Sequence, residues 1–230
     1  LRKCAQKIAA GEKDKINVTP AMVKAMLGPE KVKPTFISRT DAVGIANGLA
    51  WTSVGGEMLP IEVSIIPNGS GKVEITGSLG DVMKESAHLA LTYARVHAET
   101  YHIAPDKFKN TDIHIHAPEG AVPKDGPSAG VTLTTALISA LSEIPVRHDL
   151  AMTGEITLHG NVLPIGGLKE KSMAAFREGI STVLIPEANK PDLYEVDEEV
   201  KKAVKFIPVS DLSQVLKHAL ILPAASAAHK

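Results

Sequence analysis

The amino-acid sequence predicts an α/β (α+β) domain with a mixed sheet and a β-meander, preceded by a short helical segment. Residues 44–77 show the two-residue alternation and the turn residues of consecutive strands. Residues 81–103 carry apolar side chains at helical spacing. Residues 150–220 then repeat strand and helix patterns, an order that favours an α/β or α+β domain.

Composition and charge exclude several classes of function. The chain has 230 residues, of which 44% are hydrophobic, enough for one sizeable core. The formal net charge is -1, so no excess of charge indicates a nucleic-acid site or a membrane-surface site. No apolar run reaches the roughly 18 residues that a transmembrane helix needs. Cys4 is the only cysteine, which fits a reducing compartment and predicts a cytoplasmic protein.

The chain is expected to have three parts. Residues 1–34 predict two short helices, the second with Thr19 as its N-cap and Gly28-Pro29 as its stop. This segment has too few large apolar side chains to fold alone. The main domain is predicted over residues 35–222, and the tail 223–230 is predicted to be flexible.

The main domain is predicted to begin with the meander. Two strand patterns, at 44–54 and 58–66, flank the turn Gly55-Gly56, and a second turn leads to a third strand that ends at residue 77. The helix over 81–103 is expected to lie across these strands, and the residues that recur at helical spacing on it are Val82, Ser86, Leu89, Tyr93 and Val96.

Strands and helices alternate in the rest of the domain. A strand at 111–117 and a loop rich in proline and glycine precede a buried helix that begins at Pro127. The later elements are strands at 150–160 and 161–166, a helix from Leu168, a strand at 182–186, a helix at 191–196, a strand at 204–209 and a helix at 211–220.

Ser128 is the first candidate for chemistry. It lies in GPSAG, which fits G-x-S-x-G, at the first turn of the predicted helix and directly after Pro127. The N–H groups at a helix N-terminus have no intrahelical partner and can stabilise an oxyanion beside the serine. The same five residues are also compatible with a serine that only caps the helix.

Two known types of partner for such a serine fit poorly. An α/β-hydrolase would use an aspartate and a histidine, for which Asp149, His159 and His218 are available. Its nucleophile follows a strand directly, however, whereas PEGAVPKD precedes Gly126 here. The Ser-x-x-Lys pattern of penicillin-binding enzymes occurs nowhere in the chain. An esterase that uses Ser128 with a histidine stays open as an alternative.

Lys171 is the second candidate. At 100° per residue it shares a face of the helix LKEKSMAAFREG with Leu168, Ala174 and Ala175, and it is therefore predicted to point inward. Burial lowers the pKa of an ammonium group, and a neutral lysine can take the proton from a serine hydroxyl. A surface lysine with a buried stem is the alternative interpretation.

Two further residues are candidates for supporting roles. Thr153 ends a predicted strand, and its hydroxyl could hold the lysine amine, although ordinary strand packing is also compatible with its position. Asp125 precedes Gly126-Pro127 and is expected to cap the helix that follows or to orient the site.

Long motifs around these residues resemble one family. Three stretches are similar to the protease domain of Lon, an ATP-dependent serine protease: PEGAVPKDGPSAG at 118–130, AMTGEITLHGNVLPIGGLKEK at 151–171 and AAFREGI at 174–180. The resemblance extends to 48–62, 77–91 and 182–193 and covers nearly all of residues 40–220. The resemblance implies a Ser-Lys dyad of Ser128 and Lys171, with Thr153 as the threonine that contacts the lysine.

The resemblance also implies partners and a larger machine. It implies the domain's own α/β fold, a homo-oligomer that forms a ring of six subunits, and unfolded or damaged proteins as substrates, in protein quality control and the stress response. ATP and Mg would be used by the ATPase domain, which is missing because G-x-x-x-x-G-K-[ST] does not occur; GSGK at 69–72 is too short. Residues 1–34 resemble the last helices of that ATPase domain. No cofactor is expected in this chain.

Three observations leave functional alternatives open. His114 and His116 share one strand face, but no further ligand lies nearby in the sequence, so no metal site is predicted. Glu57 lies in a loop that resembles one bordering the family's active site. Whether Glu57 contacts the substrate or gates the cleft stays open. The alternative to an active peptidase is an assembly module whose site is not formed when it is separated from the motor.

Overall fold

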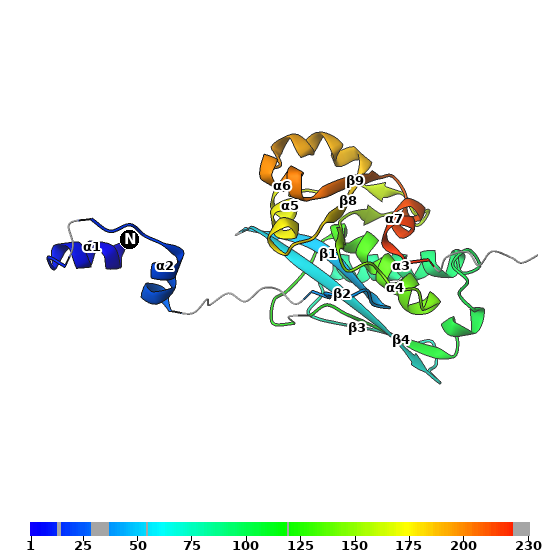
Figure 1. Cartoon of the computed structure of the whole chain (residues 1–230). Helices are drawn as coiled ribbons and strands as arrows, with labels where there is room; N and C mark the ends of the chain where they lie inside the picture. Colours follow the sequence, from blue (N-terminus) through cyan, green and yellow to red (C-terminus); the bar gives the residue numbers. More distant parts are fainter. Residues whose placement is uncertain (13–14, 29–36, 54, 119, 223–230) are drawn as a thin grey trace, which may run out of the picture. The chain divides into compact units, whose positions relative to one another are not determined.

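The computed structural model describes residues 1–12, 15–28, 37–53, 55–118 and 120–222 (Figure 1). The chain divides into two compact units, Leu1–Pro34 and Thr35–Lys230. The predicted tail, residues 223–230, and Pro29 of the predicted helix stop lie outside the described residues. Within the described ranges, no helix is both long enough and apolar enough to cross a bilayer.

The first unit contains two short helices, α1 (Arg2–Ala9) and α2 (Pro20–Leu27). The Thr19 hydroxyl accepts a hydrogen bond from the Met22 N–H at 3.3 Å, so the predicted N-cap is confirmed. Several apolar side chains of these helices remain exposed, Leu27 among them at 68%. Their exposure agrees with the small amount of apolar surface that this unit can bury.

The second unit is built on a seven-stranded mixed sheet with the order β3-β4-β2-β1-β5-β8-β9. Antiparallel pairing joins β1 to β2 and β2 to β4, whereas the other neighbours are parallel. The predicted fold class is confirmed. The strands are β1 (Ile45–Thr52), β2 (Gly55–Pro67), β3 (Val73–Thr76), β4 (Thr111–His116), β5 (Leu150–Met152), β8 (Thr182–Pro186) and β9 (Lys205–Val209). A separate pair contains β6 (Glu155–Ile156) and β7 (Val162–Leu163).

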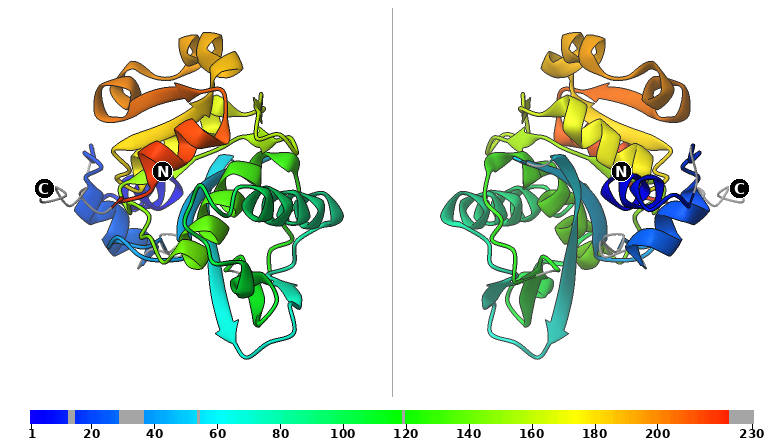
Figure 2. Two further views of the ribbon diagram at one scale, coloured as in Figure 1. Left: turned by 90° about the vertical axis from the view of Figure 1, so that its right-hand side faces the viewer. Right: turned by 90° about the vertical axis from the view of Figure 1, so that its left-hand side faces the viewer.

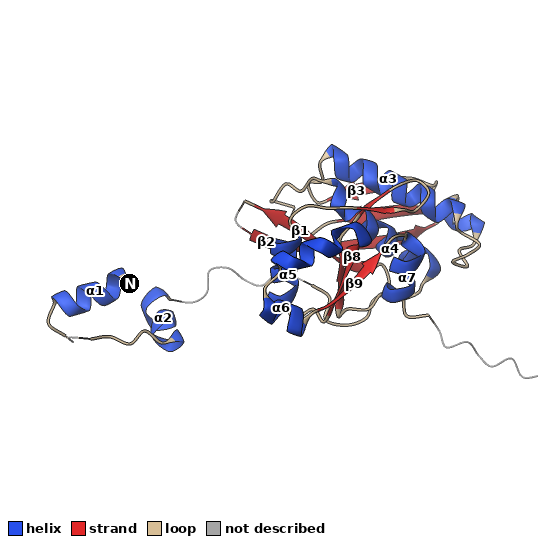
Figure 3. Ribbon diagram, turned by 90° about the horizontal axis from the view of Figure 1, so that it is seen from above, coloured by secondary structure: helices blue, strands red, loops and turns tan. Residues whose placement is uncertain are grey.

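Helices cover both faces of this sheet. In Figure 3, β8 and β9 lie between α5 and α6 on one side and α4 and α7 on the other. The helices are α3 (Asp81–Val96), α4 (Gly130–Ser142), α5 (Leu168–Arg177), α6 (Glu198–Ala203) and α7 (Leu212–Ala219), with 3-10 turns η1 (Pro105–Phe108), η2 (Pro127–Ala129) and η3 (Glu187–Glu195).

The central strands supply both apolar cores because their side chains alternate between the two faces. Leu150 and Met152 of β5 join the core beneath α3, α4 and α7, whereas Ala151 joins the core beneath α5 and α6. In the same way Leu184 of β8 lies in the first core and Val183 in the second. These strands therefore read as unbroken apolar runs, as strands buried on both faces do.

The predicted place of the third meander strand, next to the second, is wrong. β4 lies between β2 and β3, and it is parallel to β3. Figure 2 shows β2, coloured cyan, running to the turn that leads to β3. The Asp112 carboxylate at the start of β4 accepts hydrogen bonds from the N–H groups of Ser70 and Lys72 in that turn, at 2.8 and 2.9 Å. Helix α3 then supplies the crossover that two parallel strands need. The predicted pairing of β1 with β2 is confirmed.

Helix α3 ends at Val96, earlier than predicted, and only part of its predicted stripe is buried, Ser86 and Tyr93 among it. Val82 and Val96 are 42% and 71% exposed, whereas Ala87, Ala90 and Ala94 are buried where α3 packs against α4. Small side chains allow two helices to approach closely, so this helix contacts another helix through its alanines rather than covering the sheet with its valines.

Candidate active site

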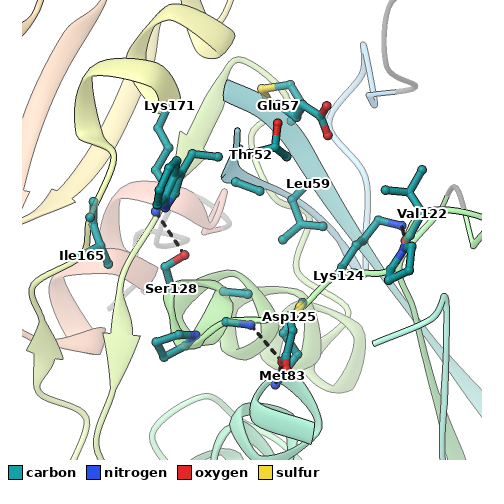
Figure 4. A pocket seen from close by; sticks show the side chains of 18 of the residues that line it. Thr52, Glu57, Leu59, Met83, Val122, Lys124, Asp125, Ser128, Ile165 and Lys171 are labelled. Atoms are coloured by element: carbon teal, nitrogen blue, oxygen red, sulfur yellow. Dashed lines mark hydrogen bonds between the residues drawn. The ribbon is translucent and has the colours of Figure 1, made fainter. Parts of the chain in front are cut away.

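A cavity of about 280 Å³ opens beside the sheet, between the β1–β2 hairpin, the loop before η2 and the loop before α5. Leu59, Met83 and Ile165 contribute apolar surface to it, and Ser128 and Lys171 reach it from two different helical elements (Figure 4). The two residues singled out by the sequence therefore share one cavity.

Ser128 lies in the 3-10 turn η2, directly before α4. Gly126 has a φ of +134°, a conformation that L side chains rarely adopt. A Cβ at Gly130 would lie 2.9 Å from the side chain of Ile156, so this glycine allows the helix start to approach β6. The Ser128 carbonyl accepts a hydrogen bond from the Gly154 N–H at 2.9 Å, which holds the turn beside the end of β5.

Lys171 is 1% exposed, and its predicted inward orientation on α5 is confirmed. Its Nζ donates hydrogen bonds to the Ser128 hydroxyl and to the Thr153 hydroxyl, each at 3.1 Å. Burial lowers the pKa of the Lys171 amine from 10.5 to about 8, because the charged form is poorly solvated there. The amine is therefore far easier to deprotonate than that of an exposed lysine.

Thr153 links the lysine to the backbone of the serine. Its side chain is buried, and its hydroxyl accepts from Lys171 and donates to the Ser128 carbonyl at 3.5 Å. Because the threonine proton is directed to this carbonyl, the Thr153 oxygen is free to accept an N–H of the lysine. The arrangement orients the amine toward Ser128.

Asp125 caps a different helix from the one expected. Its carboxylate accepts a hydrogen bond from the Met83 N–H at 3.1 Å, in the first turn of α3, and one from the Gly126 N–H at 2.9 Å. The prediction that it caps the helix after Pro127 is wrong, because the loop before Ser128 runs alongside the start of α3, where the Gly80 N–H donates to the Lys124 carbonyl. Asp125 thus holds this loop in place.

The histidine partner of an esterase is not found at the serine. Among the described residues that line the cavity there is no histidine. His159 lies between β6 and β7, and His218 lies on α7. Asp149 pairs with Arg147 at 2.8 Å, and its carboxylate also accepts from the Ser181 hydroxyl. The alternative that combines Ser128 with these residues has no support in the geometry.

The two histidines of β4 both contact the hydroxyl of one threonine. The Thr76 hydroxyl lies 2.9 Å from Nε2 of His114 and 2.7 Å from Nδ1 of His116. Within the described part of the chain, no group of three or more potential metal-ligating side chains of His, Cys, Asp and Glu is present.

Asn189 is a supporting residue that the sequence analysis did not single out. Its side-chain amide accepts from the Ile165 N–H at 2.9 Å and donates to the Ile165 carbonyl at 2.8 Å. Ile165 lines the cavity in the loop that leads to α5. A buried asparagine is a signal that could have been used, but its partner lies 24 positions away and has no recognisable pattern.

Comparison with known proteins first defines a class, that of proteolytic domains. Residues 17–222 match the family model described as Lon protease (S16) C-terminal proteolytic domain, and the chain belongs to this family. It is 54% identical over 219 residues to the Lon protease of Trichlorobacter lovleyi, 51% identical over 219 residues to that of Brevibacillus choshinensis and 52% identical over 222 residues to Lon protease 1 of Myxococcus xanthus.

These relatives are much longer than the chain. The matches cover 95%, 95% and 96% of the chain but only 27%, 28% and 27% of the three relatives. The predicted family is therefore confirmed for the proteolytic part, and the chain spans about a quarter of the relatives that it matches.

Proposed function

We propose that the chain is the serine endopeptidase domain of an ATP-dependent Lon protease and that it hydrolyses peptide bonds with a Ser128–Lys171 dyad. The observation that carries the proposal is the 3.1 Å contact between the buried Lys171 amine and the Ser128 hydroxyl, at the wall of an open cavity. Membership of a proteolytic family supports the reaction type.

In the proposed mechanism the neutral Lys171 amine takes the proton of the Ser128 hydroxyl while Oγ forms a bond to the carbonyl carbon of the substrate. Lys171 then gives this proton to the leaving nitrogen as the peptide bond breaks, which leaves an ester on Ser128. Water, deprotonated by the same amine, hydrolyses the ester. Thr153 keeps the amine oriented through both steps.

The oxyanion is expected to form beside the backbone of η2. Two N–H groups at this end of α4 are already used, because Gly130 donates to the Pro127 carbonyl and Val131 donates to the Gly154 carbonyl. We therefore assign the oxyanion donors to the N–H groups of Ser128 and Ala129. Donors placed before the reaction begins stabilise the developing charge without reorganisation.

The proposed wider role is that of the family. Unfolded or damaged proteins are the proposed substrates, delivered by the ATPase domain that uses ATP and Mg, in a cytoplasmic homohexameric ring. Residues 1–34 are proposed as the end of the ATPase small domain. The greater length of the relatives, of which this chain spans about a quarter, supports a machine with further parts.

The proposal is tested by covalent labelling of the serine. A peptidyl fluorophosphonate forms an Oγ–P bond with Ser128 and releases fluoride, and Lys171 takes the hydroxyl proton. The rate is expected to rise with pH and level off above an apparent pKa of about 8, because the neutral amine is the reactive form. Mass spectrometry identifies the labelled residue.

Peptide turnover and oligomeric mass, measured on the same sample, separate the active peptidase from the alternative of an assembly module. Turnover together with labelled Ser128 supports the peptidase. Monomers that neither turn over peptide nor label at any pH would support an assembly module whose site is not formed alone.

Replacing Thr153 by valine is expected to lower the labelling rate about 10- to 100-fold, because the amine loses an orienting hydroxyl while the shape of the side chain is kept. Thr157→Val, which removes a hydroxyl from the turn after β6, is the matched control and should label at the wild-type rate. Equal rates for both variants would remove Thr153 from the mechanism.

A further inference from the structure

We propose that the tip of the β1–β2 hairpin, residues 51–53 and 55–57, is a fixed wall of the active-site cleft that is seated on helix α5. Gly56 and Arg177 are its positioning residues, because they set the distance between this wall and Lys171. The inference rests on the proposed function, since its consequence for chemistry passes through the Ser128–Lys171 pair.

Gly56 lies against the backbone of α5. A Cβ at this position would be 1.9 Å from the carbonyl oxygen of Glu170 and 3.0 Å from the backbone nitrogen of Lys171. These atoms belong to the first turns of a helix, so they cannot move aside as the end of a flexible side chain would. Only glycine allows the hairpin to come this close, and the contact falls at the residue that carries the amine.

Two further contacts join the tip to the same helix. Arg177, the last residue of α5, donates a hydrogen bond from Nη2 to the Gly56 carbonyl at 3.1 Å. Trp51 lies over Gly167, the N-cap of α5, where a Cβ would be 2.6 Å from Cγ of the indole ring. The tip therefore contacts α5 at its N-cap, beside Lys171 and at its last residue.

The seated tip is also part of the cleft. Trp51, Thr52 and Glu57 line the cavity that contains Ser128 and Lys171. Figure 4 shows Thr52 and Glu57 on the strand side of this cavity, with Lys171 reaching in from its helix. Substrate bound in the cleft would contact a wall whose position is fixed to the general base.

The strand that continues from the tip helps to bury the same helix. Met58 is 4% exposed and belongs to the apolar core that contains Leu168 and Ala175 of α5. A tip that moved away from α5 would therefore admit water near Lys171 as well as widen the cleft. Substrate binding and the basicity of the lysine are coupled through this contact.

Gly56→Ala directly tests the close contact between the hairpin tip and α5. In the 230-residue chain, the limiting rate of Ser128 labelling by the peptidyl fluorophosphonate is expected to fall at least about tenfold, because small displacements of a base are costly. The apparent pKa of the labelling rate should rise above that of the wild type, because the amine becomes hydrated. Gly120→Ala is the control, since a Cβ there would meet only the Gly77 Cα, at 3.8 Å.

Arg177→Met removes the hydrogen bond to the Gly56 carbonyl from a side chain that is 56% exposed. It also removes a 3.9 Å ion pair with the buried Glu178, which keeps Arg39 as a partner at 3.4 Å. The probe concentration for half-maximal labelling should rise about three- to tenfold with a smaller change in the limiting rate, and Arg177→Lys should restore part of the loss. Trp51 is the only tryptophan, so its quenching by acrylamide reports the tip directly and should increase in Arg177→Met. Lys169→Met, on an exposed position of α5, is the control.

Wild-type quenching of Trp51 in Arg177→Met, together with an unchanged labelling profile, would overturn the inference. If Gly56→Ala does not fold, the Arg177→Met measurements alone test the inference. The tryptophan signal does not depend on hydrolysis, so it remains informative if Ser128→Ala still cleaves peptides, a result that would overturn the proposed function instead.

Discussion

Replacing Ser128 by alanine is expected to reduce peptide cleavage by at least about 10³-fold. Two hydroxyls lie 3.1 Å from the Lys171 amine, those of Ser128 and Thr153. Ser128 lines the cavity and can form the acyl ester, whereas Thr153 is buried and does not line it. Removing one oxygen leaves η2 and α4 intact, because the contacts that hold this turn are made by the Ser128 carbonyl and not by its side chain.

The measurement is turnover of a fluorogenic peptide, followed by mass spectrometry after exposure to the fluorophosphonate. Ser142→Ala is a matched control, because its hydroxyl only donates to the Ile138 carbonyl at the far end of α4. The control should cleave and label normally. Undiminished turnover by Ser128→Ala would mean that the nucleophile lies elsewhere.

Lys171→Met is expected to abolish cleavage and, unusually for a buried position, to stabilise the fold. At pH 7 the folded state must hold a charged amine in a buried site. The difference between 10.5 and about 8 corresponds to about 3 kcal/mol. Methionine removes this cost but leaves the Ser128 and Thr153 hydroxyls without their partner, which costs about 1–2 kcal/mol. A net gain of about 1–2 kcal/mol in the free energy of unfolding is expected.

The pH dependence of stability identifies the cause. Because the pKa of Lys171 is lowered in the folded state, the unfolded chain binds more protons between pH 8 and 10.5. The wild type should therefore gain stability as pH rises through this window, with the full cost present below it. Urea unfolding from pH 7 to 10 should show this slope reduced in Lys171→Met and kept in the exposed control Lys169→Met. Equal slopes in all three proteins would contradict a buried, destabilising charge.

Several features of the fold could be read from short stretches of sequence. The inward face of α5 follows from the spacing of Leu168, Lys171 and Ala175, because helical period alone decides which side chains share a face. The strand pairing of β3 could not be read in this way. It depends on Asp112, which binds the preceding turn from 40 and 42 positions away.

The candidate site shows the same division. Ser128 and Lys171 could each be selected from their local setting, and long family motifs linked the two. The helix that Asp125 caps and the hydrogen bonds between Asn189 and Ile165 had no local signal in the sequence. Both depend on loops that meet only after the elements have packed.

Residue type and period are local properties, so they identify a serine at a helix start and a lysine on an inward face. The distance between the two is not local. Ser128 precedes α4 on one face of the sheet, Lys171 belongs to α5 on the other, and they meet past the end of β5, where Thr153 stands between the two layers. The strand order of the sheet joins segments that are far apart in the sequence, and it is this order that brings together two residues 43 positions apart.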